Sequence, residues 1–252
     1  MNKARFTFIK KVITVIRTLL SYLLVGVVMI LFVMPMLLLL CLPANYRPYK
    51  AIFWLLNMTY QGILFSSMIP ITVIKKGNIP DEPSIIVANH QSALDIPLVG
   101  ALLNGKPHMW YALAFYARKP VLGFLIRRLG VSVERDRPEG GARSLVSGIR
   151  RMQKSTSHAI IFPEGTRRTD GSIHQFFKGF ALLAKKTGRP VVPVYLNNPG
   201  VNFPMGSFLV HRRPIHIVVG PPFYFRENDT PEQFTERVRN WFIQEASLMS
   251  VS

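Results

Sequence analysis

The chain has 252 residues, of which 49% are hydrophobic, and its 31 Lys and Arg against 13 Asp and Glu give a formal net charge of +18. Its mean hydropathy of +0.23 indicates membrane-embedded sequence, and its single cysteine, Cys41, excludes an internal disulfide and any metal site built from several cysteines. A balance this basic favours an anionic partner: nucleic acid, an anionic membrane, or an acidic substrate or carrier protein.

The N-terminal part of the chain carries the membrane signal. No Asp or Glu precedes Asp81, and residues 19–42 form an uncharged run of 24 residues, long enough to cross a hydrocarbon core of about 30 Å as a helix. The cations before this run are Lys3, Arg5, Lys10, Lys11 and Arg17. A signal peptide is the alternative, but its apolar region is usually about 7–15 residues long. We therefore predict a retained membrane segment.

A second uncharged run, residues 51–74, is interrupted by polar side chains. The connection CLPANYRPYK carries two prolines, so the two runs predict a helical hairpin that crosses the bilayer or enters one leaflet. One anchor followed by a buried core helix is the alternative. The basic N-terminus is predicted to lie in the cytoplasm, and a hairpin returns the rest of the chain to that side. We divide the chain into membrane-associated helices over 1–78 and a second domain over 79–252.

Beyond Lys75, short β-rich runs alternate with helical patterns, which predicts an α/β fold: a mixed sheet of about seven strands covered by helices. The expected strands are 84–88, 109–113, 131–133, 159–162, 191–196, 208–211 and 215–219. The expected helices are 91–103, 121–129, 141–154 and 179–187. A last helix follows Thr230, where Pro231 suits the first helical position and Gln233 completes a capping box.

The stretch VANHQSALDIP places His90 and Asp95 five residues apart, directly after the apolar run SIIVA. His90 is expected at the C-terminal end of a strand, where α/β folds tend to keep their sites. Asp95 can reach back across the first helical turn to one imidazole nitrogen and leave the other free to accept a proton. A His and an Asp at this spacing also occur by chance, so two unrelated surface residues are the alternative.

The stretch IIFPEGTRR again runs from an apolar strand into a polar turn. Gly165 lets the backbone approach a ligand, and the hydroxyl of Thr166 and the guanidinium of Arg167 can hold phosphate oxygens. We interpret Glu164 as an organiser of this turn rather than a proton donor. An ordinary turn with a surface ion pair is the alternative.

Two further stretches are weaker signals. LGVSVERDR brings Arg135 to a strand edge, where it can bind an anion, although a solvated charge cluster is the alternative. VVPVYLN is a strand interrupted by Pro193, which indicates an edge, a bulge or the lining of an apolar ligand site. A plain core strand is the alternative there.

In this order, NHQSALD, GVSVER, FPEGTR and VPV resemble the four blocks of the glycerolipid acyltransferase family, which includes 1-acylglycerol-3-phosphate acyltransferases. The first block matches the Asn-His-x4-Asp form and the third matches Phe-Pro-Glu-Gly-Thr-Arg in full. The likeness runs from about residue 84 to 220. The second block departs from the family pattern, with Ser132 where an aromatic residue is commoner.

The resemblance implies a role for each matching residue. His90 is implied as the general base that deprotonates a glycerol hydroxyl, and Asp95 as the residue that holds it in place. The residues implied to bind the acceptor phosphate are Arg135, Glu164, Gly165, Thr166 and Arg167, with Lys178 as a further cation. The hydroxyl attacks the thioester directly, in keeping with the absence of a Gly-x-Ser-x-Gly nucleophile elbow from the sequence.

The resemblance implies acyl transfer from acyl-CoA or acyl carrier protein to the sn-2 hydroxyl of 1-acylglycerol-3-phosphate (lysophosphatidic acid), giving phosphatidic acid. We expect membrane lipids as partners and no resident cofactor. We expect no metal, because the remaining histidines lack ligand spacing. We expect no nucleic acid, because the chain has a membrane segment and no recognised nucleic-acid motif. The expected location is the bacterial cytoplasmic membrane, with the catalytic domain facing the cytoplasm. The alternatives are another acceptor, such as a lyso-ornithine lipid or a lysophospholipid, and a non-catalytic basic module that docks on membranes.

Overall fold

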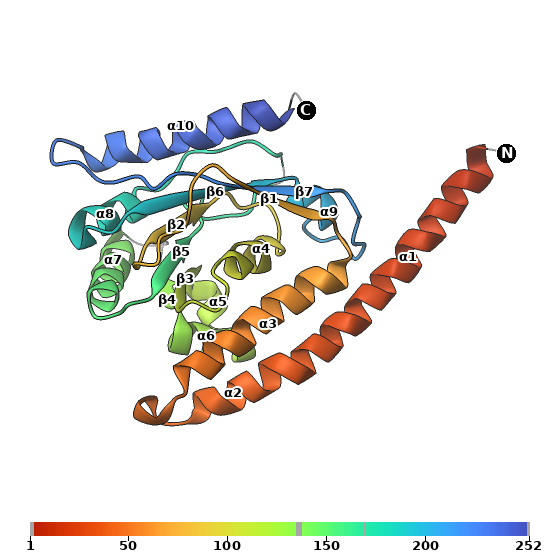
Figure 1. The fold of residues 1–252 in the computed structure, drawn as a ribbon, viewed down its shortest axis with the longest axis horizontal. Coiled ribbons are helices and arrows are strands. Elements are labelled where there is room, and N and C mark those ends of the chain that lie inside the picture. The colour runs from red at the N-terminus through yellow and green to blue at the C-terminus, as the bar shows by residue number, and fades with distance from the viewer. Residues whose placement is uncertain (1–2, 135–137, 169, 251–252) are drawn as a thin grey trace. The chain divides into compact units, whose positions relative to one another are not determined.

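The computed structural model describes residues 3–134, 138–168 and 170–250 and divides the chain into two compact units (Figure 1). Unit 1 comprises Met1–Thr72, Gln91–Gly105 and Asn198–His216, and unit 2 comprises Val73–His90, Lys106–Asn197 and Ile217–Ser252. Both units are therefore assembled from separate stretches of sequence. The domain boundary that we placed at residues 78 and 79 stays a prediction.

Unit 1 begins with a long helical segment made of α1 (Lys3–Val28), a π-helical turn (Met29–Val33) and α2 (Met34–Cys41). The π turn ends two residues before Pro35, which has no N–H to donate, and the N–H of Met34 donates to the carbonyl of Met29, five residues earlier. Among the described residues one helical stretch, Thr7–Cys41, is long and apolar enough to cross a membrane, with a hydropathy of 3.0.

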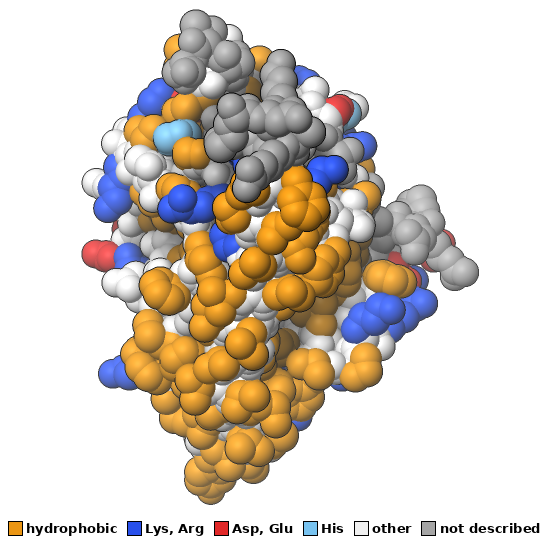
Figure 2. Space-filling model, turned by 90° about the vertical axis from the view of Figure 1, so that its right-hand side faces the viewer, with side chains coloured by type: hydrophobic (Ala, Val, Ile, Leu, Met, Phe, Trp, Pro, Cys, Tyr) orange, Lys and Arg blue, Asp and Glu red, His pale blue; other side chains and the backbone are white. Residues whose placement is uncertain are grey.

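A short 3-10 turn (Ala44–Tyr46) connects this segment to α3 (Tyr49–Ser67), which lies alongside it (Figure 1). The two helices approach closely at Gly62, where a Cβ would lie 2.7 Å from Cγ2 of Val28. Large apolar side chains of unit 1 remain exposed, among them Leu38 at 70% and Phe65 at 81%. Figure 2 shows hydrophobic side chains gathered over a broad surface.

The second apolar run does not stay helical to residue 74. Helix α3 ends at Ser67, its C-cap residue Met68 has a left-handed backbone with φ of 55°, and strand β1 (Ile71–Lys75) follows. Our assignment of the last residues of this run to a hairpin helix was therefore wrong. The β-branched residues Ile71, Thr72, Val73 and Ile74 explain the change, because such side chains favour a strand.

Seven strands form one sheet in the order β1-β7-β6-β2-β5-β3-β4, which confirms the predicted α/β fold. The other strands are β2 (Ile85–Ala88), β3 (His108–Leu113), β4 (Val131–Val133), β5 (His158–Ile161), β6 (Val191–Asn197) and β7 (Ile215–Val219). Strand β2 pairs in parallel with β5 and β6, and β3 pairs in parallel with β5 and β4. All four residues of β2 are buried, as expected of a central parallel strand.

Helices complete both units. Unit 1 also holds α4 (Asp95–Leu102) and α9 (Pro199–Asn202), while unit 2 holds α5 (Ala114–Ala117), α6 (Pro120–Leu129), α7 (Pro138–Gln153), α8 (Gly179–Thr187) and α10 (Pro231–Ser250). The predicted capping box of α10 is confirmed, since Thr230 Oγ1 accepts from the N–H of Gln233 and Gln233 Oε1 accepts from the N–H of Thr230. Phe234, Val238 and Phe242 of this helix are buried in the core of unit 2.

The strand predicted over residues 208–211 is wrong, because this segment has no regular secondary structure. Side chains of α1 bind its backbone in place of a neighbouring strand. Thr18 Oγ1 accepts from the N–H of Val210, Arg17 donates to the carbonyl of Val210, and Tyr22 donates to the carbonyl of Phe208. The sheet still has seven strands, because β1, which we did not predict as a strand, is one of them.

Gly100 of α4 provides a test of packing inside unit 1. A Cβ at this position would lie 2.3 Å from Cε2 of the buried Tyr60 on α3. We expect Gly100→Ala to lower the free energy of unfolding by about 1–3 kcal/mol, because the ring has to move within a packed core. Thermal unfolding in detergent micelles measures this effect. Gly179→Ala, which meets no atom within 4 Å, is the control and is expected to be neutral or stabilising.

Two buried histidines predict sensitivity to acid. His108 and His158 are register partners at the starts of β3 and β5, each 2% exposed, and burial lowers the pKa of both from 6.5 to about 4. Between about pH 6.5 and 4 the unfolded chain binds protons that the folded chain does not. Stability is therefore expected to fall as the pH drops through this window. Unfolding curves from pH 7 to 4 check this, and His108→Asn with His158→Asn should flatten the dependence.

Candidate active site

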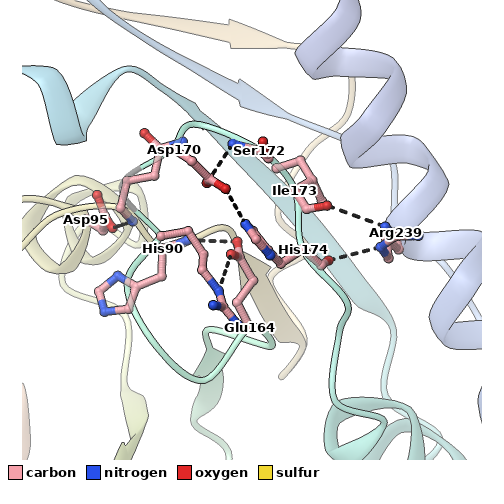
Figure 3. A network of polar contacts seen from close by, with 10 residues as sticks. His90, Asp95, Glu164, Asp170, Ser172, Ile173, His174 and Arg239 are labelled. Atoms are coloured by element: carbon pink, nitrogen blue, oxygen red, sulfur yellow. Dashed lines mark hydrogen bonds and ion pairs between the residues drawn. The ribbon is translucent and has the colours of Figure 1, made fainter.

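The backbone of His90 is held on both sides by one loop. His90 follows β2 by two residues, and its N–H donates to Oε1 of Glu164 at 3.3 Å while its carbonyl accepts from the N–H of Arg168 at 2.8 Å (Figure 3). Glu164 is only 1% exposed, and its Oε2 lies 3.9 Å from Nε of Arg168. The first and third sequence blocks thus meet at the ends of the paired strands β2 and β5, where Glu164 contacts the backbone of His90. The role of Glu164 as an organiser of the site stays a prediction.

The loop over residues 163–177 is closed on itself. The N–H of Phe177 donates to the carbonyl of Pro163 at 2.8 Å, and the N–H of Gly165 donates to the carbonyl of Phe162. Gly165 adopts a φ of 70°, a conformation that glycine adopts without a steric penalty. Thr166 is exposed and Arg167 is half-buried, so the loop presents a hydroxyl and a guanidinium next to the segment that holds His90.

The far side of the loop is attached to α10. Arg239 donates from Nε to the carbonyl of His174 at 3.0 Å and from a terminal nitrogen to the carbonyl of Ile173 at 3.4 Å (Figure 3). Within the loop, Oδ2 of Asp170 lies 2.7 Å from Nε2 of His174, and the hydrogen bond from this histidine lowers the pKa of Asp170. The loop is therefore held by His90 at Arg168 and by Arg239 at Ile173 and His174.

The imidazole of His90 stacks on an aromatic ring that the sequence analysis did not assign to the site. The ring centroids of His90 and Phe162 are 4.0 Å apart and their planes differ by 9°. Phe162 in turn stacks on Trp110 of β3, at 5.6 Å and 27°. Phe162 lies inside the quoted third stretch, but Trp110 lies in none of the four stretches. Only the order β2-β5-β3 of the strands brings the three rings together.

Asp95 is the first residue of α4 and is fully buried. Its Oδ2 accepts from the N–H groups of Gln91 at 2.6 Å and Ser92 at 2.8 Å, which fixes the turn directly after His90 (Figure 3). A carboxylate at a helix N-terminus is also stabilised by the helix dipole. The predicted contact between Asp95 and the imidazole of His90 stays a prediction.

The fourth block is tied to the first through Asn89. The side chain of this buried residue donates to the carbonyl of Leu196 at 2.9 Å and accepts from the N–H of Leu196 at 2.8 Å. The pair continues the pairing of β2 with β6 beyond the end of β2. Pro193 lies within β6 opposite Val87 and is buried. Because β6 lies between β7 and β2, this proline is in a central strand and not at an edge of the sheet.

Two further residues, Arg135 and Lys178, are predicted to bind the phosphate. Arg135 lies outside the residues that the structure describes. Lys178 is exposed and forms an ion pair with Glu232 in the first turn of α10, and this contact lowers the pKa of Glu232. The predicted contacts of both residues with a phosphate stay predictions. Among the described residues no group of three or more His, Cys, Asp or Glu could hold a metal ion.

Removing the carboxylate of Glu164 tests its organising role. Glu164→Ala leaves the N–H of His90 and the guanidinium of Arg168 without this partner, so we expect a loss of about 1–3 kcal/mol in the free energy of unfolding. Hydrogen exchange at the amides of His90 and Arg168 should become faster. Glu164→Gln keeps an acceptor oxygen and should lose less; equal losses in the two variants would contradict a role through the His90 amide.

Comparisons with known proteins show which family this chain resembles. A family model described as Acyltransferase matches residues 70–197, which is half of the chain. The 1-acyl-sn-glycerol-3-phosphate acyltransferase BAT2 of Brassica napus is 31% identical over 69% of this chain and 50% of its own length. The enzyme of that name from Pseudomonas aeruginosa is 26% identical over 63% of this chain and 61% of its own length.

The chain thus spans about half to two thirds of the length of these relatives. A third relative with the same enzyme name, from Borreliella burgdorferi, is 32% identical over 66% of this chain and 70% of its own length. The crystal structure of the 1-acyl-sn-glycerophosphate acyltransferase PlsC of Thermotoga maritima shares the fold, with a TM-score of 0.79, 24% identity and coverage of 96% of this chain and 98% of that one. With its matching family model and four sequence blocks, the chain belongs to the acyltransferase family.

Proposed function

We propose that the protein is a membrane-bound 1-acyl-sn-glycerol-3-phosphate acyltransferase. It transfers an acyl group from a thioester to the sn-2 hydroxyl of lysophosphatidic acid, and the product is phosphatidic acid. The observation that carries this proposal is the attachment of His90 to the loop that presents Thr166 and Arg167. A proton acceptor and the proposed phosphate-binding groups are thereby joined by hydrogen bonds. The names of the relatives support the same acceptor.

In the proposed mechanism, His90 removes the proton of the sn-2 hydroxyl as the oxygen attacks the thioester carbonyl. The tetrahedral intermediate collapses, its C–S bond breaks, and the thiolate leaves with the proton that His90 had accepted. One ester forms and one thioester is broken, so no oxidant, reductant or covalent enzyme intermediate is required. General-base catalysis of this kind contributes about 10²–10⁴-fold to the rate.

The phosphate of the acceptor is assigned to the loop and its neighbouring cations. Gly165 allows close approach of the backbone, Thr166 offers a hydroxyl, and Arg167 offers a planar guanidinium that matches phosphate oxygens. Arg135 and Lys178 are proposed as further cations of this site. Glu164 acts on the phosphate indirectly, through the loop conformation that it maintains.

The proposed donor is acyl-CoA or an acyl carrier protein, both acidic, in keeping with the net charge of +18. The proposed location is the bacterial cytoplasmic membrane, with the catalytic residues on the cytoplasmic side. The apolar helical stretch Thr7–Cys41 and the cations among residues 3–17 support this placement. No resident cofactor takes part in the proposed reaction.

The test is acyl transfer by the full-length protein in detergent micelles, with lysophosphatidic acid and a lyso-ornithine lipid offered separately. Acyl-CoA and acyl carrier protein donors are compared on each acceptor. Phosphatidic acid is the expected product, and His90→Ala should lose at least about a hundredfold in rate. His216→Ala, a half-buried histidine of β7, is the matched control and should keep wild-type activity.

Product from the lyso-ornithine lipid alone would overturn the acceptor and keep the chemistry. Equal activity of His90→Ala and the wild type would overturn His90 as the base. An absence of transfer from either donor to either acceptor, by a folded protein that binds anionic vesicles, would favour a non-catalytic membrane module.

A further inference from the structure

We propose that Phe162 is a positioning residue for the reaction, acting through the ring of His90, with Trp110 as its support. This inference rests on the proposed function, in which His90 is the base. The observation behind it is a stacking contact. The face of the His90 imidazole lies on the face of the Phe162 ring, with 4.0 Å between the ring centroids and 9° between the ring planes.

The stack has a definite origin in the sheet. His90 follows β2, Phe162 follows β5 and Trp110 lies on β3, and these three strands are neighbours in the sheet. Trp110 is the register partner of Ile160, two residues before Phe162, so Trp110 and Phe162 project on the same face of the sheet. The Trp110 ring lies 5.6 Å from that of Phe162 at 27°. Phe162 is thus held between two rings.

The first consequence is orientation. The backbone of His90 is fixed by Glu164 and Arg168, which leaves the side-chain torsions as the remaining freedom of the imidazole. An aromatic ring stacked in a nearly parallel plane restricts the plane of the imidazole and leaves both nitrogens at the edge of the stack. Since a displacement of about 1 Å can cost a hundredfold in rate, a fixed ring plane contributes directly to proton transfer.

The second consequence is electrostatic. The face of a benzene ring carries negative charge density and attracts a cation placed over it, by about 0.5–2 kcal/mol depending on solvent exposure. The neutral imidazole becomes a cation when it accepts the hydroxyl proton. Phe162 therefore stabilises the species that forms during the reaction more than the resting base, which is the condition for a gain in rate rather than in binding.

The test compares Phe162→Leu with Phe162→Tyr in the full-length protein. Leucine keeps an apolar side chain and removes the π face, whereas tyrosine restores the face. We expect Phe162→Leu to lower kcat about threefold to thirtyfold with KM unchanged for both substrates, and Phe162→Tyr to recover most of the loss. Phe115→Leu replaces an exposed phenylalanine of α5 and is the control.

A second readout does not depend on turnover. NMR of ¹³C-histidine-labelled protein follows the ring signals of His90, which are assigned by their loss in His90→Gln. An aromatic ring shifts the signals of protons over its face upfield, so we expect the His90 ring signals to move downfield in Phe162→Leu and to return in Phe162→Tyr. The charged groups next to His90 in unit 2, Glu164 and Arg168, are the same in all these variants.

Several results would overturn the inference: wild-type kcat in Phe162→Leu, a raised KM with unchanged kcat, or a Phe162→Tyr variant as impaired as Phe162→Leu. Trp110→Leu serves if Phe162→Leu does not fold, and it should shift the same two quantities in the same direction by less. No shift in that variant would also overturn it. If His90→Ala proves fully active, the proposed role of His90 as the base fails, and the NMR signals still decide whether Phe162 holds the imidazole in the stack.

Discussion

The buried carboxylate of Glu164 is the constraint on which the site depends. A carboxylate with 1% exposure is costly to bury unless hydrogen bonds and a cation compensate it, and here the amide of His90 and the guanidinium of Arg168 do so. The compensation joins two segments that are 74 residues apart in sequence. The same carboxylate therefore contacts the backbone of His90 through Oε1 and the guanidinium of Arg168 through Oε2.

Strand pairing and two further polar side chains hold the segments on either side of His90. The parallel pairing of β2 with β5 and β6 brings three of the four sequence blocks to one edge of the sheet. Asn89 fastens the first block to the fourth through both backbone groups of Leu196. Asp95 fixes the turn that follows His90 by accepting from two successive amides. Polar side chains therefore replace strand pairing at the points where the strands end.

The sequence predicted those parts of the fold that local patterns determine. Apolar runs located β2, β5 and β6, and the Thr230–Gln233 pair located the start of α10. It failed where distant contacts decide: residues 208–211 have strand-like side chains, but Thr18 and Arg17 bind their backbone. For the site, the motifs located His90 and Glu164, while Trp110 required the register of β3 with β5, which no local pattern contains. Arg135 lies outside the described residues, so its place stays a prediction.

The attachment of the loop to α10 has a consequence for how such a protein can diversify. Arg239 holds two loop carbonyls and Glu232 holds Lys178, so a helix that carries none of the four blocks helps to set the shape of the loop that carries Thr166 and Arg167. Substitutions in α10 can therefore change the shape of the loop without altering any of the four blocks. Two chains with the same four blocks can then differ in the conformation of this loop because a distant helix differs.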